Sequence, residues 1–246
     1  MLAAVAVTGC TTFDPTLGMG SVVAATATTR IDPFVTGSVV PDNDVIALAP
    51  DPTVLPAPSG GFNYALIYAA TTVDGIALPA VDYERVGYDH LRRSVDWYGG
   101  EAVGDIVIDT SSRHLYLIEP DNRAIRYGIS VGREGFGWTG VEPLSWKRSW
   151  PTWTPPASMI EREPQLERWR EGMPGGASNP LGARALYLGN TLYRIHGTDK
   201  PYSIGEAASS GCFRMINQDV IDLYERARPG ATVHVRSGVG AEVASN

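Results

Sequence analysis

The chain has 246 residues, of which 43% are hydrophobic and 19% are charged, so it is long enough to bury a sizeable core in one large domain, or in one domain with a tail. Its formal net charge is -7, and the sequence contains no patch rich in Lys and Arg. Because proteins that bind nucleic acids concentrate basic residues to neutralise phosphates, these features argue against a nucleic-acid partner.

The first ten residues, MLAAVAVTGC, are an apolar run that leads through Val7-Thr8-Gly9 to Cys10. This pattern is typical of the end of a bacterial lipoprotein signal, although the basic region that normally precedes the apolar run is missing. A late start codon, a truncated sequence or a coincidence of small residues would each explain that absence. We expect residues 1–10 to be a partial signal segment with lipidation at Cys10, and the protein to lie in the periplasm or cell envelope. The lipid anchor would be its only contact with a membrane.

The next two segments differ in composition from the rest of the chain. Residues 1–60 contain one basic residue, no Glu and seven prolines, so we interpret 11–61 as a linker rich in Pro, Ala and Thr. Residues 62–103 are predicted to be an accessory N-terminal segment, with a strand over 62–72 and turns near Gly75 and Pro79.

A clear β pattern begins at Gly104. The runs GDIVIDT, RHLYLIE and AIRYGISVG are short and separated by turn residues, which predicts three strands in a meander. Residues 133–182 are rich in Gly, Pro and Trp, so we expect a long irregular and functional segment there. ARALYLG (183–189) and TLYRIH (191–196) predict a hairpin joined near Gly189-Asn190, with His196 at the end of its second strand.

A helix and a last strand complete the domain. Asn217 is expected to cap a helix through DVIDLYERAR that ends at Pro229-Gly230, and ATVHVR is predicted to be the closing strand. Mostly short strands with one helix predict a mainly β fold, a sandwich of mixed sheets over 104–237, followed by a tail at 238–246.

Other sequence patterns that can indicate a functional site are not supported by their surroundings. Gly135, Gly137 and Gly140 fit G-x-G-x-x-G, but VEPLSWKRSWP follows them and does not start a helix, so no nucleotide site is predicted. None of the four histidines forms a close pair that would hold a metal, and His114 and His234 are interpreted as ordinary strand histidines. A G-x-S-x-G elbow is absent from the sequence.

The remaining candidate site is a histidine followed sixteen positions later by a cysteine, His196 and Cys212. A free cysteine is often only a small buried hydrophobe, and that alternative stays open on residue types alone. A nearby imidazole, however, can take the thiol proton and return it to a leaving amine. The small residues Ser209, Ser210 and Gly211 leave room for a substrate carbonyl, and backbone N–H groups near Gly211 and Cys212 could donate to an oxyanion.

The sequence around this pair resembles the L,D-transpeptidase family of the YkuD type. The chain has His196-Gly197-Thr198 and the run Ser209 to Arg214 (SSGCFR), where the family signature is His-Gly-Thr followed by Ser-x-Gly-Cys-x-Arg or Asn. The resemblance continues through GDIVIDTSSRHLYLIE, MPGGASNPLGARALYLG and DVIDLYERARPGATVHV. One departure is Ser210, where many relatives have His, which weakens only a claim that a second imidazole assists.

The resemblance implies an L,D-transpeptidase-like β-sandwich with a helix after the Cys motif. It implies Cys212 as nucleophile, His196 as base and then acid, and the Gly197 carbonyl as the group that orients the imidazole. Ser209, Ser210, Gly211 and Arg214 are expected at the substrate, with loop ordering the alternative for Ser209 and a structural salt bridge the alternative for Arg214.

The implied activity is transfer of a peptidoglycan tetrapeptide stem, held as a Cys thioester, to an amine acceptor. The acceptor would be another stem peptide, or a lipoprotein or outer-membrane protein. Two alternatives stay open: hydrolysis of the same thioester by an L,D-carboxypeptidase or amidase, and a catalytically silent cell-wall-binding lipoprotein. No cofactor or metal is expected, because nucleophile and base are both side chains.

Overall fold

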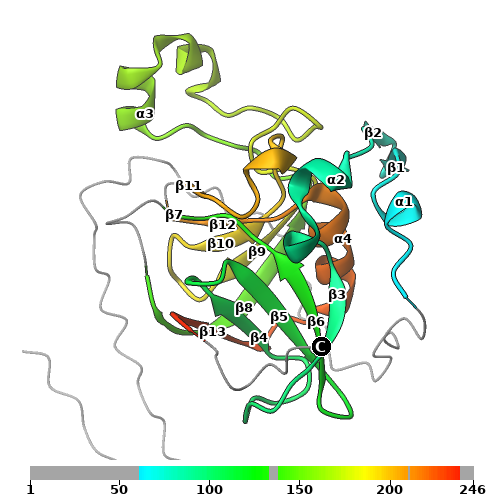
Figure 1. Cartoon of the computed structure of the whole chain (residues 1–246). Helices are drawn as coiled ribbons and strands as arrows, with labels where there is room; N and C mark the ends of the chain where they lie inside the picture. The colour runs from blue at the N-terminus through cyan, green and yellow to red at the C-terminus, as the bar shows by residue number, and fades with distance from the viewer. Residues whose placement is uncertain (1–60, 133–137, 210, 239–246) are drawn as a thin grey trace, which may run out of the picture. The chain divides into compact units, whose positions relative to one another are not determined.

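The structure is a computed structural model that describes residues 61–132, 138–209 and 211–238. Within this part of the chain, nine strands form one mixed sheet in the order β12-β10-β9-β8-β13-β4-β5-β6-β3 (Figure 1). These strands are β3 (Arg93–Asp96), β4 (Ile106–Asp109), β5 (His114–Glu119), β6 (Arg123–Gly128), β8 (Gly140–Ser149), β9 (Arg184–Leu188), β10 (Arg194–His196), β12 (Phe213–Arg214) and β13 (Thr232–Arg236).

Smaller elements surround this sheet. There are two small two-stranded sheets among the described residues: β1 (Thr71–Val73) pairs with β2 (Ile76–Leu78), and β7 (Val131–Gly132) pairs with β11 (Ala207–Ser209). The α-helices are α1 (Tyr64–Ile67), α2 (Tyr83–Val86), α3 (Ala157–Arg162) and α4 (Asn217–Arg226), and the 3-10 helices are η1 (Tyr88–His90), η2 (Pro164–Trp169) and η3 (Pro201–Ser203). No helix in the described ranges is long and apolar enough to span a bilayer.

The predicted meander is confirmed as β4, β5 and β6, which pair antiparallel in sequence order. Its first strand, β4, is buried on both faces, since Ile106, Val107 and Ile108 have no exposed surface. Ile106 and Ile108 belong to the main core, and Val107 packs in a second cluster with Trp97 and other side chains on the opposite face. The continuous apolar run in GDIVIDT follows from this double burial.

The long strand β8 joins two layers of the sheet. Residues 140–143 pair with β13, whereas residues 144–149 pair with β9 after a register shift between Leu144 and Trp146. A strand that changes partner at a bulge is how one continuous sheet turns a corner and packs on itself. The predicted mainly β fold of two packed layers is therefore confirmed, with the layers connected through β8.

The main core lies between these layers and α4. It contains side chains from β4, β5 and β6 on one side and from β9, β10 and β12 on the other, together with Val220 and Leu223 of α4. Both α4 side chains are fully buried, and burial of such a side chain contributes about 1.5–3 kcal/mol. Because α4 starts three residues after Arg214 of β12, this packing also anchors the segment that carries the Cys motif.

The N-terminal segment differs from its prediction. Residues 62–72 were expected to be one strand, but α1 occupies 64–67, because the Asn63 side chain accepts a hydrogen bond from the Leu66 N–H at 3.2 Å and starts a helical turn. Gly75 does lie in the turn between β1 and β2, at φ 79°. Figure 1 shows α1, β1 and β2 beside α4, and β3 continues the main sheet next to β6.

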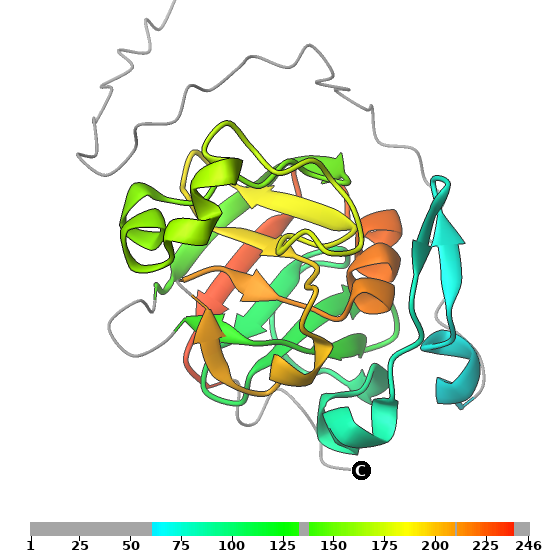
Figure 2. The same ribbon diagram turned by 90° about the horizontal axis from the view of Figure 1, so that it is seen from above.

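The segment over 133–182 is also more regular than expected, because β8 spans 140–149 within it. The prediction missed this strand because its exposed positions carry Pro143, Ser145 and Trp146, so no clean alternation marks it. The rest of the segment carries α3 and η2; Figure 1 shows α3 standing away from the sheet, and Figure 2 shows the fold from above. From Gly140 the backbone forms a strand rather than the helix that a dinucleotide site would require; Gly135 and Gly137 lie outside the described residues.

Candidate active site

His196 is the last residue of β10, as predicted. Ile195 before it pairs with Leu186 of β9 and is fully buried in the main core. Since side chains alternate along a strand, His196 projects from the opposite face of the sheet. Two backbone hydrogen bonds hold the chain at His196. The His196 carbonyl accepts from Met215 N at 2.8 Å, and Gly197 N donates to the Arg184 carbonyl at 3.0 Å.

The imidazole of His196 has a defined tautomer. Its Nδ1 lies 2.6 Å from the carbonyl oxygen of Gly197. A carbonyl can only accept, so Nδ1 must carry the hydrogen and donate it. In the neutral ring, Nε2 is then the unprotonated nitrogen that can take up a proton.

The surroundings of His196 keep this ring neutral. The side chain is 4% exposed, and burial lowers its pKa to about 3. The hydrogen bond to Gly197 opposes this shift, whereas the positive charges of Arg194 and Arg214 reinforce it. Near neutral pH, His196 is therefore neutral, with its one hydrogen on Nδ1 and with Nε2 free to act as a base.

The backbone after His196 is held by Asn217. Its Nδ2 donates to the Thr198 carbonyl at 2.8 Å, and its Oδ1 accepts from Ala183 N at 2.9 Å. A Cβ on Gly197 would lie 2.2 Å from that Oδ1, so only glycine fits there. The predicted N-cap role of Asn217 is wrong: the helix is capped at Ile216 without a side-chain bond, because the amide of Asn217 is used in these tertiary contacts.

Cys212 lies between β11 and β12, directly before Phe213. Gly211 has φ 123°, a conformation that favours glycine, and turns the chain into β12. β12 runs parallel to β10 with Phe213 opposite Ile195 and Arg214 opposite His196. Phe213 is buried in the core, and Arg214, the strand partner of His196, projects to the same face as His196. Cys212 lies in the bend directly before β12.

The thiol itself is partly accessible. Cys212 is half-buried, and its Sγ lies 3.8 Å from the carbonyl of Leu192 in the hairpin between β9 and β10. The strand neighbours of Cys212 are also fixed, since Arg214 exchanges two backbone hydrogen bonds with Ser130, at 2.9 and 3.0 Å. A partly exposed sulfur thus lies at the start of the strand that pairs with the strand of the buried base.

Basic and aromatic residues, which sequence reasoning did not select, occupy the same face. Tyr187 of β9 is opposite both Arg194 and Trp146, and its ring stacks on Trp146 with centroids 3.5 Å apart. Burial raises the pKa of Tyr187, the charges of Arg194 and Arg148 oppose that rise, and Cys212 adds to it. Arg194 could have been found from the sequence, because it precedes His196 by two positions in the strand pattern.

The structure describes only some of the predicted substrate residues. Arg214 and Gly211 lie on either side of Cys212, as the sequence order requires. Ser209 forms part of β11, which pairs with β7, but its side chain and all of Ser210 lie outside the described part of the chain. The same holds for Cys10, for the linker up to residue 60 and for residues 239–246.

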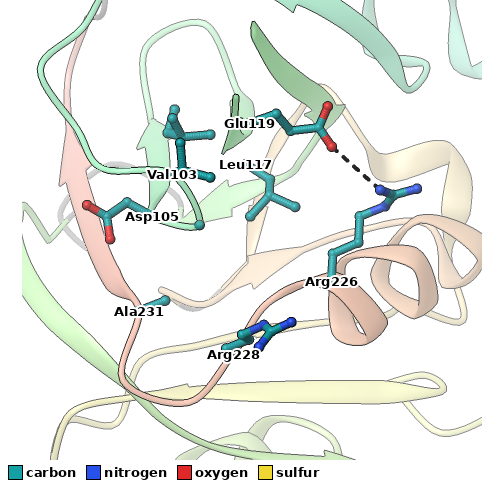
Figure 3. A pocket seen from close by; sticks show the side chains of 9 residues that line it. Val103, Asp105, Leu117, Glu119, Arg226, Arg228 and Ala231 are labelled. Carbon is teal, nitrogen blue, oxygen red and sulfur yellow. Dashed lines mark hydrogen bonds and ion pairs between the residues drawn. The ribbon is translucent and has the colours of Figure 1, made fainter. Parts of the chain in front are cut away.

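A cavity of about 230 Å³ lies elsewhere in the fold, between the start of β4, the end of β5 and the end of α4. Figure 3 shows Glu119 and Arg226 at its wall, with an ion pair of 3.5 Å between them. The cavity shares no residue with the His196 or Cys212 segments. No group of three or more His, Cys, Asp or Glu in the described ranges could hold a metal ion.

The sequence was compared with known proteins. The YkuD family model, the L,D-transpeptidase catalytic domain, matches residues 104–235. Among curated proteins, the chain is similar to the probable L,D-transpeptidase YbiS of Escherichia coli K12, with 36% identity over 136 residues. It is also similar to the probable L,D-transpeptidase ErfK/SrfK of the same strain, with 33% identity over 138 residues. These matches cover 52% and 53% of the chain and 43% of each relative.

Among solved structures, the chain is 49% identical to a protein described as a probable carnitine operon oxidoreductase from Brucella melitensis, over 56% of this chain and 88% of that one. The TM-score is 0.40, which supports no structural conclusion. The chain spans less than half the length of the two curated relatives. The family model, however, covers more than half of the chain and contains both His196 and Cys212. The chain therefore belongs to the YkuD family of L,D-transpeptidase catalytic domains.

Proposed function

We propose that this protein is a cysteine-dependent L,D-transpeptidase that forms a thioester with a peptidoglycan tetrapeptide stem. Cys212 Sγ attacks the carbonyl before the terminal D-amino acid while His196 Nε2 takes the thiol proton. The C–S bond forms, the C–N bond breaks, and His196 returns the proton to the leaving amine. An acceptor amine then attacks the thioester, loses its proton to Nε2, and releases the thiol.

The observation that carries this proposal is the 2.6 Å hydrogen bond from His196 Nδ1 to the Gly197 carbonyl. It leaves Nε2 as the basic nitrogen, on a strand that pairs with β12, and Cys212 directly precedes β12. In acyl transfer, a thiol or hydroxyl is activated by an imidazole that has one ring nitrogen bonded to an orienting acceptor. The other ring nitrogen faces the nucleophile.

The backbone around Cys212 supports a second part of the chemistry. Gly211 carries no side chain and has a backbone conformation that favours glycine, so a substrate carbonyl can approach the Cys212 N–H closely. Backbone N–H groups placed in this way would stabilise the oxyanion of the tetrahedral intermediate. Gly211 and Cys212 are the residues that we expect to provide them, with Ser209 and Ser210 ordering the loop or contacting the peptide.

The charge of the site fits an anionic donor. Arg194 and Arg214 both act on His196, and Arg148 lies close enough to influence Tyr187. Although the whole chain has a net charge of -7, both charged side chains that act on His196 are basic. A peptide stem with free carboxylates would be attracted to this face.

We expect the partners to be stem peptides in the cell envelope, with a stem amine, a lipoprotein or an outer-membrane protein as acceptor. The test is incubation with a purified tetrapeptide, with and without an amine acceptor, followed by mass spectrometry of the products. A tripeptide transferred to the amine supports the proposal. Free tripeptide without any transfer product would instead identify a hydrolase, and no reaction of correctly folded protein would identify a silent binding module.

A further inference from the structure

Arg194 occupies a special position beside the proposed nucleophile. It precedes Ile195 on β10, Cys212 comes directly before Phe213, the first residue of β12, and Ile195 and Phe213 are paired. Neighbouring strands lie about 4.8 Å apart, so Arg194 and Cys212 lie close together beside this pair, and both act on Tyr187. A ligand that reaches the sulfur must therefore pass close to this arginine.

Aromatic rings, rather than an acid, hold the Arg194 side chain. Its guanidinium carbon is 5.4 Å from the ring centroid of Tyr187, and Tyr187 is stacked on Trp146 with an interplanar angle of 7°. Trp146 is 41% exposed, so the stack borders solvent. These contacts orient the guanidinium without neutralising it.

Arg194 lacks the acidic partner that several other arginines of the described ranges have. Six arginines of the described segments form ion pairs with Asp or Glu: Arg92, Arg123, Arg170, Arg184, Arg226 and Arg236. No described carboxylate lies within 4.0 Å of Arg194, and its Nε is buried without a hydrogen-bond partner. A half-buried guanidinium that Tyr187 orients and that has no acidic partner among the described residues is suited to a planar carboxylate.

We propose that Arg194 binds the terminal carboxylate of the donor peptide, and so selects donors that end in a free acid next to the scissile amide. This inference rests on the proposed function. In such a donor the carboxylate follows the scissile nitrogen after a single Cα, so it stays within a few bonds of the atom that Cys212 attacks. The charge is on the leaving residue and is lost with it, so Arg194 acts on the donor and not on the thioester.

The test compares a tetrapeptide donor that has a free terminal carboxylate with the same peptide as a terminal amide. Arg194→Gln and Arg194→Lys are measured beside wild type, with Arg168→Gln as a matched control. Arg168 is exposed on η2 and stacks on Trp169, so this control removes the same charge from an element other than β10 and β12. Circular dichroism and thermal melting check that each variant is folded.

We expect Arg194→Gln to raise KM for the free acid about 10- to 100-fold, with a smaller change in kcat, because a charge-assisted hydrogen bond is lost. Arg194→Lys should recover part of the loss, and Arg168→Gln should have no effect. For the amide donor, wild type should be as poor as Arg194→Gln. Equal losses of Arg194→Gln on both donors, or no loss on either, would overturn the inference.

A binding measurement separates this inference from the proposed chemistry. In a Cys212→Ala background, calorimetry should show that Arg194→Gln weakens binding of the free acid and leaves binding of the amide unchanged. If wild type binds the acid in preference to the amide but never turns it over, the carboxylate site stands and the transferase proposal fails. If turnover occurs without any preference between acid and amide, the carboxylate site fails alone.

Discussion

Two parts of the molecule use arginine in opposite ways. Where α4 meets the N-terminal segment, Arg92 lies between two acids of the helix, with Nε 3.5 Å from Asp219 and Nη1 2.7 Å from Asp222. The Tyr68 hydroxyl donates to the carboxylate of Asp219 at 3.1 Å and accepts from Arg92 N at 3.0 Å. These groups join residues 151 positions apart in the chain.

On the β10 and β12 face, in contrast, Arg194 is supported by Tyr187 and has no described acidic partner. A charge that is buried with its partners fixes two segments relative to each other, whereas an oriented charge without a partner is available to a ligand. The comparison implies that substitutions in the α4 contact mainly change stability, and substitutions on the β10 and β12 face mainly change activity.

Cys212→Ala should show the largest effect and the sharpest separation. Removing the nucleophile should lower the rate of tripeptide formation by roughly 10⁴-fold or more. The free energy of unfolding should change by less than about 1 kcal/mol, because the side chain is half-buried and small. Denaturant unfolding and product analysis on the same preparation measure both quantities. A stability loss that accounts for the lost activity would break the comparison.

Arg92→Met should show the reverse. It leaves Asp219 and Asp222 without their shared cation, and breaking such a buried pair costs about 3–5 kcal/mol. Chemical denaturation measures the loss, with Arg162→Met as the control, since Arg162 is exposed on α3. At a temperature where the variant is still folded, its activity should remain near that of wild type. A catalytic defect in fully folded Arg92→Met would instead connect the α4 contact to the site.

Asn217→Ala tests the link between the two regions, because α4 begins at Asn217 and its amide holds the backbone of Ala183 and Thr198. Loss of both bonds should lower the free energy of unfolding by about 1–3 kcal/mol and should also reduce kcat through a misplaced His196. Asn217→Asp keeps the oxygen but loses the donor to Thr198. A variant with reduced stability and unchanged kcat would show that the amide is needed only for folding.

The pH dependence of stability should have opposite signs in the two regions. Burial raises the pKa of Asp219 to about 7 although Arg92 opposes the shift, so the folded state holds this proton more tightly than the unfolded state. Its stabilising contribution is present below about pH 4 and is lost as the pH rises towards 7. For His196, with its pKa lowered to about 3, the contribution is present above about pH 6.5 and is lost as the pH falls towards 3.

Denaturation from pH 4 to 7 can separate these contributions. The stability advantage of wild type over Asp219→Asn should shrink as the pH rises, whereas its advantage over His196→Gln should grow, each by on the order of 1 kcal/mol or more. Parallel curves for both variants would contradict the assigned protonation states.

The smallest expected effect is on the imidazole itself. Arg194 and Arg214 reinforce the low pKa of His196, so Arg194→Gln should raise that pKa, with burial still keeping it below the ordinary value. NMR titration of His196 in the absence of peptide measures the shift. An unchanged pKa would show that the guanidinium does not act electrostatically on His196.

Local patterns predicted much of the site and fold. The alternation in TLYRIH placed His196 at a strand end, and the apolar runs after Gly104 identified β4, β5 and β6. The structure differs where distant contacts decide the outcome. Asn217 has the residue type of a cap, but Ala183 and Thr198 take its amide. β8 forms because it pairs with both β13 and β9, although its own sequence has no clear strand pattern. The contact of Tyr68 with Asp219 likewise has no signal in the local sequence.

Trapping the acyl intermediate tests the central claim most directly. Wild type is mixed with tetrapeptide, quenched in acid and measured by intact-mass spectrometry, followed by peptide mapping. We expect a mass increase equal to the tetrapeptide minus its terminal residue and minus water, located on Cys212 and absent in Cys212→Ala. An adduct on any other residue, or tripeptide release that persists in folded Cys212→Ala, would contradict covalent catalysis by this cysteine.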